Sequence, residues 1–237
     1  MINEVFPGKR GGWFIDSGAG PDGIYNSNTY ALESQLGWTG LLVEPHPERH
    51  PDVVKNRNAI VEQVCLTDKP GEVTLTLNPH APGTSGIVEE MSEPNRVAFE
   101  AEAMPTVTVP SVPLWELLRK HNAPSVIEYL SLDIEGAEWL ALKDFPFDEF
   151  RILCMTVERG GRDYWRLARK LQREGYRLAR VSGPDDFIYH ESIDYRPSVQ
   201  EKVRAHVVGL GARLYYEEPL LTVRRIARFV RSKIRGY

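Results

Sequence analysis

Acidic residues gather where an apolar stretch of the sequence ends, in "YLSLDIEGAEWL" (residues 129–140). Asp133 follows the apolar run directly, and Glu135 and Glu138 come next. Acids are common in the first turn of a helix, which accounts for Glu138 and in part for Glu135 but not for Asp133. Glu158 ends a second apolar run in the same way. Such carboxylates could take a proton from a bound substrate or hold a divalent ion.

A glycine-rich turn lies upstream, in "FIDSGAGPDG" (residues 14–23). It has the G-x-G-x-x-G spacing of a dinucleotide-binding turn, which alone does not identify the ligand. Asp16 precedes the first glycine, where it would repel a pyrophosphate, and Pro21 removes one backbone N–H that could bind phosphate. A cationic ligand is favoured instead. S-adenosylmethionine, with its ammonium and sulfonium groups, suits this turn better than NAD or FAD.

Further ligand contacts are predicted after the next two strands. Glu44 ends "LLVE", where a carboxylate can accept hydrogen bonds from both ribose hydroxyls of either kind of nucleoside ligand. In "CLTD", Leu66 is expected against the adenine ring, with Thr67 or Asp68 at its amino edge. Asp68 could equally begin the turn that follows it.

Positioning these residues requires an alternation of strands and helices. The pattern predicts an α/β fold with a mostly parallel, doubly wound sheet. Predicted strands cover residues 12–18, 40–45, 58–68, 126–136, 150–161, 176–182 and 185–190, with 71–77 as an added edge strand or hairpin arm. Predicted helices cover residues 28–37, 112–122 and 164–175, and another opens at Gly136.

Length and composition fit one globular domain. The chain has 237 residues, 42% of them hydrophobic, and a formal net charge of −4, which does not favour a nucleic-acid partner. We expect the domain to span residues 1–193, with an excursion or lid at about 78–105. Residues 194–237 would form a helical tail.

Cysteines and hydropathy predict the compartment. Cys65 and Cys154 lie in apolar, strand-like runs and are expected to be buried free thiols, as in a reducing cytosol. The N-terminal residues do not resemble a secretion signal, and no apolar run is long enough for a membrane span. We therefore expect a cytoplasmic protein.

The end of the tail, residues 220–237, combines an apolar helical face with basic residues and no acidic residue. The simpler interpretation is a docked terminal helix with solvated basic side chains. The alternative is a contact with a membrane surface or an anionic substrate.

Several ordered motifs resemble the FkbM family of S-adenosylmethionine-dependent methyltransferases. They are "WFIDSGAGPDG", "SNTYALESQLGWTGLLVEPHP", "SLDIEGAE", and "TVER" followed by "GY". The resemblance runs from about residue 12 to about residue 181. It implies a class I methyltransferase (Rossmann-like) fold with seven strands, one of them antiparallel, and usually O-methylation.

The resemblance also implies roles for individual residues. Asp16, Gly18, Gly20 and Asn28 would belong to the cofactor site. Glu44 would bind the ribose. Asp133 would face the point of methyl transfer and contact the cofactor.

The expected reaction is in-line transfer of a methyl group to a small-molecule hydroxyl or carboxyl group. For a hydroxyl acceptor, Glu135 and Glu158 are the candidate bases, and Asp133 would orient the reactants. A carboxylate acceptor would need no base and could be held by Arg159 or by a basic side chain of the tail. Because Arg159 follows Glu158 where a second acid would be expected, a divalent metal ion is not favoured.

Two other classes of function remain open from the sequence. A nicotinamide-dependent oxidoreductase would explain the glycines and Glu44, but not the carboxylates beside them. A non-catalytic module that binds S-adenosylmethionine would need no acceptor chemistry.

Overall fold

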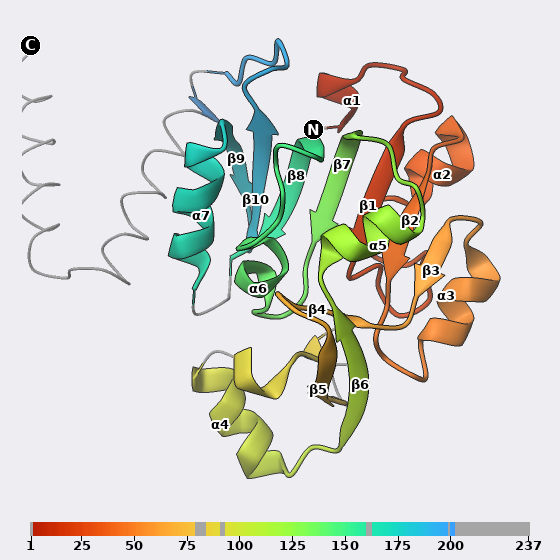
Figure 1. Ribbon diagram of the computed structural model, residues 1–237, viewed down its shortest axis with the longest axis vertical. Coiled ribbons are helices and arrows are strands. Elements are labelled where there is room, and N and C mark those ends of the chain that lie inside the picture. The colour runs from red at the N-terminus through yellow and green to blue at the C-terminus, as the bar shows by residue number, and fades with distance from the viewer. Residues whose placement is uncertain (1, 79–83, 91–92, 160–162, 199, 202–237) are drawn as a thin grey trace, which may run out of the picture.

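The computed structural model of the chain describes residues 2–78, 84–90, 93–159, 163–198 and 200–201. Its main sheet has seven strands, ordered β3 (Ile60–Glu62), β2 (Thr39–Val43), β1 (Trp13–Ser17), β7 (Val126–Leu132), β8 (Arg151–Glu158), β10 (Asp185–His190) and β9 (Tyr176–Ser182) (Figure 1). All neighbouring pairs are parallel except those of β10, which is antiparallel to β8 and to β9. The prediction of a mostly parallel seven-stranded sheet with one antiparallel strand is confirmed.

The central strands are apolar on both faces. Along β1, Phe14 belongs to one buried cluster and Ile15 to another, and Leu42 and Leu41 of β2 divide in the same way. Successive side chains of a strand point to opposite faces. A strand buried on both sides reads as a continuous apolar run, which is why these strands could be predicted.

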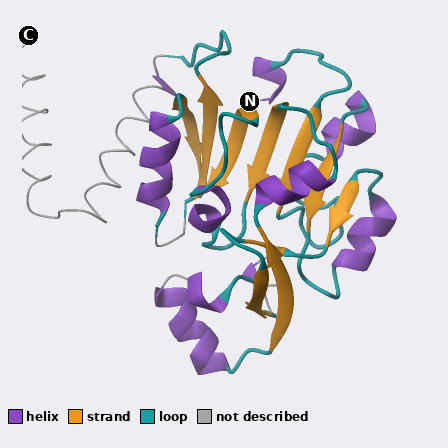
Figure 2. Cartoon of the chain, viewed as in Figure 1, coloured by secondary structure: helices purple, strands orange, loops and turns teal. Residues whose placement is uncertain are grey.

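Helices supply the other half of each cluster (Figure 2). Leu114 of α5 (Leu114–Lys120) and Leu167 of α7 (Tyr164–Arg173) pack in the cluster that contains Ile15. Leu32 of α2 (Tyr30–Leu36) and Val53 of α3 (His50–Asn56) pack in the cluster that contains Phe14. The short helix α6 (Glu138–Leu142) packs in the first of these clusters, and the short helix α1 (Ile2–Val5) packs against the second. Among the described residues, no helix combines the length and the apolar character that crossing a membrane requires.

A second, smaller sheet contains β4 (Cys65–Leu66), β6 (Thr106–Val112) and β5 (Gly71–Thr76), in that order. The 3-10 helix η2 (Val88–Glu90) and helix α4 (Glu93–Glu102) lie between β5 and β6 in sequence. Figure 1 shows this unit beneath the end of the main sheet at which the parallel strands terminate. Its apolar side chains form a third cluster with Ala137.

One predicted strand is wrong in its extent. Residues 58–68 do not form one strand, because β3 pairs with β2 in the main sheet whereas β4 pairs with β6 in the small sheet. The chain changes sheets between the two, and both halves are apolar enough to read as one run.

The prediction that residues 71–77 form an edge strand or hairpin arm is confirmed, since β5 pairs antiparallel with β6 at the edge of the small sheet. The predicted basic helix at 220–237 lies outside the described residues.

Candidate active site

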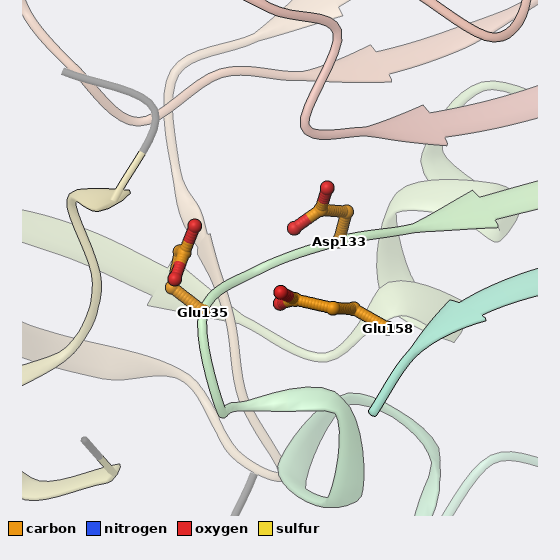
Figure 3. A group of neighbouring side chains, drawn as sticks. All are labelled: Asp133, Glu135 and Glu158. Carbon is orange, nitrogen blue, oxygen red and sulfur yellow. The ribbon is translucent and has the colours of Figure 1, made fainter. Parts of the chain in front are cut away.

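Three carboxylates converge at the end of the main sheet (Figure 3). Asp133 directly follows β7, Glu135 lies in the turn after it, and Glu158 is the last residue of β8. One carboxylate oxygen from each lies within 4.8 Å of the other two. The parallel pairing of β7 with β8, which sets Leu132 opposite Val157, brings their two ends to the same edge. We call these three residues the acidic cluster.

The acidic cluster titrates near neutral pH. Burial raises the pKa of Glu135 to about 7, and the charge of Asp133 adds to the effect. Burial and the charge of Glu135 raise the pKa of Glu158 to about 7. Asp133 is exposed at the mouth of the site, yet desolvation of its carboxylate and the neighbouring Glu158 raise its pKa to about 8. A carboxylate with a pKa in this range is suited to accept a proton at physiological pH.

The backbone around Glu135 is held in an unusual conformation. Its φ of 56° lies in the left-handed region that residues other than glycine seldom adopt. Gly86 of the small-sheet unit packs so closely that a Cβ atom there would lie 2.9 Å from the Glu135 Cβ atom. Glu138 accepts hydrogen bonds from the backbone N–H groups of Ile134 and Gly136, so this acid stabilises the turn. That contact agrees with the structural role expected for Glu138.

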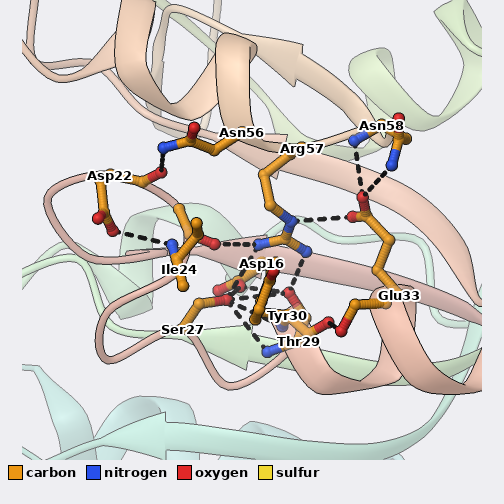
Figure 4. Close-up of polar contacts among 12 residues, drawn as sticks. Asp16, Asp22, Ile24, Ser27, Thr29, Tyr30, Glu33, Asn56, Arg57 and Asn58 are labelled. Atoms are coloured by element: carbon orange, nitrogen blue, oxygen red, sulfur yellow. Dashed lines mark hydrogen bonds and ion pairs between the residues drawn. The ribbon is translucent and has the colours of Figure 1, made fainter.

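Asp16 is fully buried at the end of β1 (Figure 4). Its Oδ2 atom accepts hydrogen bonds from Thr29 Oγ1 at 2.5 Å and from Ser27 Oγ at 2.9 Å. Its Oδ1 atom has no hydrogen-bond partner within the described part of the chain. Burial raises the pKa of Asp16, and this rise is opposed by the hydroxyl groups of Thr29 and Ser27, by the charge of Arg57 and by the neighbouring Ser131 hydroxyl. An unpaired buried carboxylate oxygen is expected where a polar ligand binds.

The glycine turn lies against the acidic cluster. Gly18 has a φ of 101°, and a Cβ atom there would lie 2.3 Å from the carbonyl oxygen of Asp133. Gly20 has a φ of 76°, and a Cβ atom there would lie 2.0 Å from the carbonyl oxygen of Tyr25. Asn28 is exposed, and its Nδ2 atom donates to Ser131 Oγ at 3.0 Å. The turn therefore needs glycine at both positions, and Asn28 ties its end to β7.

A hollow of about 570 Å³, counting space open to solvent, adjoins the acidic cluster. Glu44 lies in it and is 4% exposed. Its Oε1 atom accepts a hydrogen bond from the His46 backbone N–H at 2.8 Å, and burial raises the pKa of Glu44 to about 7. The predicted site residues Gly18, Glu44, Leu66, Asp133 and Glu135 all line this hollow. Asp16, Gly20, Asn28 and Glu158 are not part of its lining.

Asp68, one of two residues expected at the amino edge of an adenine, has another contact. Its Oδ2 atom forms an ion pair with Lys143 Nζ at 2.5 Å. The Thr67 hydroxyl donates to the carbonyl oxygen of Lys69 at 2.8 Å, as in a turn. This geometry favours the turn interpretation of the segment that begins at Asp68.

Arg159, a candidate to hold a carboxylate acceptor, is already engaged. Its Nε atom lies 2.9 Å from Asp186 Oδ1, and its Nη2 atom donates to the Gly183 carbonyl oxygen at 2.6 Å. Arg49 lines the hollow instead, and its Nε and Nη2 atoms have no hydrogen-bond partner among the described residues.

Three residues at the site could not be predicted from the sequence: Arg49, Asp185 and Arg57. Asp185 faces Glu158 in the register of β10 with β8 and adds negative charge to the acidic cluster. Arg57 lies beneath the glycine turn. The signal for Arg49 was its position five residues after Glu44, close to a strand end.

The comparisons with known proteins agree with this geometry. The family model described as "Methyltransferase FkbM domain" matches residues 16–178, which contain every predicted site residue from Asp16 to Glu158. A search of curated proteins gives no match. The family match covers more than half of the chain and begins at the buried carboxylate of the glycine turn. The chain belongs to the FkbM methyltransferase family.

Proposed function

We propose that the protein is an S-adenosylmethionine-dependent O-methyltransferase with the doubly wound class I methyltransferase fold, acting on a hydroxyl group of a small molecule. One observation carries the proposal. The acidic cluster, with pKa values raised to about 7 to 8, adjoins a hollow lined by Gly18, Glu44 and Leu66. Family membership supplies the reaction class.

The residues of the hollow and the turn fit the proposed methyl donor. The unpaired Oδ1 atom of Asp16 is a buried anionic acceptor suited to an ammonium group. Glu44 would accept hydrogen bonds from ribose hydroxyls, and Leu66 offers an apolar surface for adenine. When bound, S-adenosylmethionine supplies a methyl group activated by its sulfonium.

The protein's contribution would be positioning and proton transfer. Methyl transfer requires the acceptor oxygen, the methyl carbon and the sulfur to lie in line, so geometry supplies much of the rate. Glu135 or Glu158 would accept the proton that a hydroxyl loses as its oxygen attacks. Asp133, between the glycine turn and Glu158, would orient the acceptor.

Alternatives are less well supported by these residues. A pyrophosphate would meet Asp16 and the acidic cluster, which disfavours a nicotinamide cofactor. A module that only binds the cofactor would have no use for carboxylates with raised pKa values. A divalent ion would suit three converging carboxylates by donor chemistry, but the proposed mechanism requires none.

The proposal includes a cellular location and the kind of partner that the protein binds. Cys65 and Cys154 are buried free thiols, which supports a reducing, cytoplasmic location. The partner would be a small molecule that enters beside the small-sheet unit, whose Gly86 contacts Glu135. We propose that this unit, whose 3-10 helix η2 and helix α4 fall in the predicted excursion at about 78–105, serves as the cover of the acceptor site.

Transfer of labelled methyl groups tests the proposal. The purified protein would be incubated with methyl-labelled S-adenosylmethionine and a panel of sugars and other hydroxylated small molecules. We expect label in a product that survives mild alkaline hydrolysis, as a methyl ether does. Label released as methanol would show a methyl ester and would replace the hydroxyl acceptor with a carboxyl acceptor.

A further inference from the structure

Arg57 lies buried beneath the glycine turn, although it follows α3 and is remote from that turn in sequence. Its side chain is fully buried, with an exposed fraction of 0%. The guanidinium donates four hydrogen bonds, and each nitrogen takes part. Nε donates to Glu33 Oε2 at 2.9 Å, Nη1 donates to the Gly23 carbonyl oxygen at 2.8 Å and to Ser27 Oγ at 3.0 Å, and Nη2 donates to Thr29 Oγ1 at 2.9 Å.

These bonds fix the direction of two hydroxyl protons. A guanidinium can only donate hydrogen bonds, so the hydroxyl oxygens of Ser27 and Thr29 must accept from Arg57. Each hydroxyl then has a single proton left to donate. Both protons go to Oδ2 of Asp16, at 2.9 Å and 2.5 Å (Figure 4).

The two oxygens of Asp16 are therefore unlike. Oδ2 accepts two hydrogen bonds whose donors are themselves held by a positive charge. Oδ1 accepts no hydrogen bond of normal geometry from the described residues, although the Asp16 side chain is fully buried. The Ser131 hydroxyl lies near enough to lower the pKa of Asp16, and its effect is smaller than those of Thr29, Ser27 and Arg57. Leaving a buried charged oxygen unpaired is costly, so the arrangement suits a ligand that pairs with Oδ1.

We propose that Arg57 positions the Asp16 carboxylate for the cofactor's ammonium group, by directing the protons of Ser27 and Thr29 onto Oδ2 and leaving Oδ1 for the ligand. This inference rests on the proposed function, in which Asp16 binds that ammonium. Arg57 touches no ligand in this scheme and acts through the two hydroxyl groups. Its bonds to Gly23 and Glu33 also brace the turn, and the test must separate that structural role.

Comparing two ligands separates the positioning role of Arg57 from its structural role. S-adenosylhomocysteine carries the ammonium group, whereas methylthioadenosine has the same adenosine but no ammonium. Calorimetry would measure both affinities for the full chain and for two variants. Thr29→Val retains the shape of Thr29 and the charge of Arg57 but removes one directed proton, and Arg57→Lys retains a charge without the planar fork.

We expect each variant to lose about ten-fold or more in affinity for S-adenosylhomocysteine, the size of one hydrogen bond to a charged group. Affinity for methylthioadenosine should change by less than about two-fold, because Glu44 and Leu66 are untouched. Thr29→Ser, which retains the hydroxyl group, should restore the lost affinity.

Glu128→Gln is the matched control for lost stability. Glu128 is a buried carboxylate near the other end of β7, where it accepts hydrogen bonds from Lys9 Nζ and the Trp13 backbone N–H. This variant should lower Tm without changing the ratio of the two affinities. If Thr29→Val and Arg57→Lys lower the affinities for both ligands by the same factor, or lower neither affinity, the proposed positioning role of Arg57 is wrong. If the unmodified protein binds methylthioadenosine and not S-adenosylhomocysteine, or binds neither, the proposed function itself fails.

Discussion

Gly18 packs directly against the main chain of Asp133. A Cβ atom on Gly18 would lie 2.3 Å from the Asp133 carbonyl oxygen, and the Asp133 N–H donates to the Ser17 carbonyl oxygen at 3.0 Å. The glycine turn after β1 and the acidic end of β7 are therefore in direct backbone contact. A change in the turn must reach the acidic cluster.

Gly18→Ala should disrupt this contact. The new methyl group would collide with backbone, and alanine disfavours the φ of 101°, so we expect a loss of more than about 1 kcal/mol in stability. Binding of S-adenosylhomocysteine should be lost as well. Gly183→Ala is the control for backbone strain, because Gly183 has a φ of 59° with nothing within 4 Å of a Cβ atom. Tm and calorimetry measure both variants. Full affinity in Gly18→Ala would contradict the close contact.

Glu135→Gln and Glu158→Gln test the general base. With a hydroxyl acceptor, loss of the base should lower kcat by about 10²- to 10⁴-fold, in one variant more than in the other. Because the base acts only when deprotonated, kcat of the unmodified enzyme should rise as pH increases through about 7. Turnover against pH checks both statements. Unchanged kcat in both variants would exclude these residues as the base.

A chelator distinguishes proton transfer from metal binding in the same assay. We expect unchanged turnover after treatment with EDTA, because the proposed base needs no metal ion. Loss of activity that added Mg²⁺ restores would instead make Asp133, Glu135 and Glu158 metal ligands.

Most of the main sheet could be predicted because its strands are buried on both faces. Asp133 and Glu158 could also be predicted as neighbours, since parallel strands end at one edge. The small sheet could not be predicted in the same way. β4 has only two residues, and β6 pairs with strands that are distant in sequence. Its placement depends on tertiary contacts that no local pattern encodes.

The acidic cluster should make stability depend on pH. A carboxyl group whose pKa is about 7 when folded and about 4.3 when unfolded stabilises the protein below its unfolded pKa, and that contribution is lost as pH rises through about 7. Glu158→Gln should therefore raise Tm at pH 8. Because the site is partly open to water, we expect about 1 kcal/mol, or roughly 2–4 °C.

Glu149→Gln is the control for removing any acid. Glu149 is ion-paired with Arg119, which lowers the pKa of Glu149, so its loss should not raise Tm at pH 8. A Tm for Glu158→Gln that is equal to or below that of the unmodified protein at pH 8 would refute the repulsion in the acidic cluster.

Gly86→Ala, a change in the small-sheet unit, should displace Glu135 in the turn after β7. The added Cβ atom would lie 2.9 Å from the Glu135 Cβ atom and 3.0 Å from its carbonyl oxygen. We expect kcat to fall about ten-fold or more, because small displacements of a positioned catalytic group are costly. Gly71→Ala is the matched control in the same unit, since its Cβ atom would meet only Ser111 Oγ, at 3.6 Å. Equal kcat in the two variants would show that the contact has no effect on the site.

The buried arginine explains why part of the site escaped sequence analysis. In the sequence, Arg57 lies in the polar run "KNRN" and reads as a solvated residue. In the structure it is fully buried and bonded to Glu33, Gly23, Ser27 and Thr29. Only the return of the chain from α3 to the glycine turn brings these groups together. The place of Asp16 at the end of β1 could be predicted from the sequence, but the Arg57, Ser27 and Thr29 network around it could not.

Calorimetric binding of S-adenosylhomocysteine and NAD would decide which ligand the glycine turn accepts. We expect the protein to bind S-adenosylhomocysteine and not NAD. Asp16→Asn should weaken that binding about ten-fold or more, because it removes the charge facing the ammonium. Binding of NAD without S-adenosylhomocysteine, or full affinity in Asp16→Asn, would contradict the assignment of the turn.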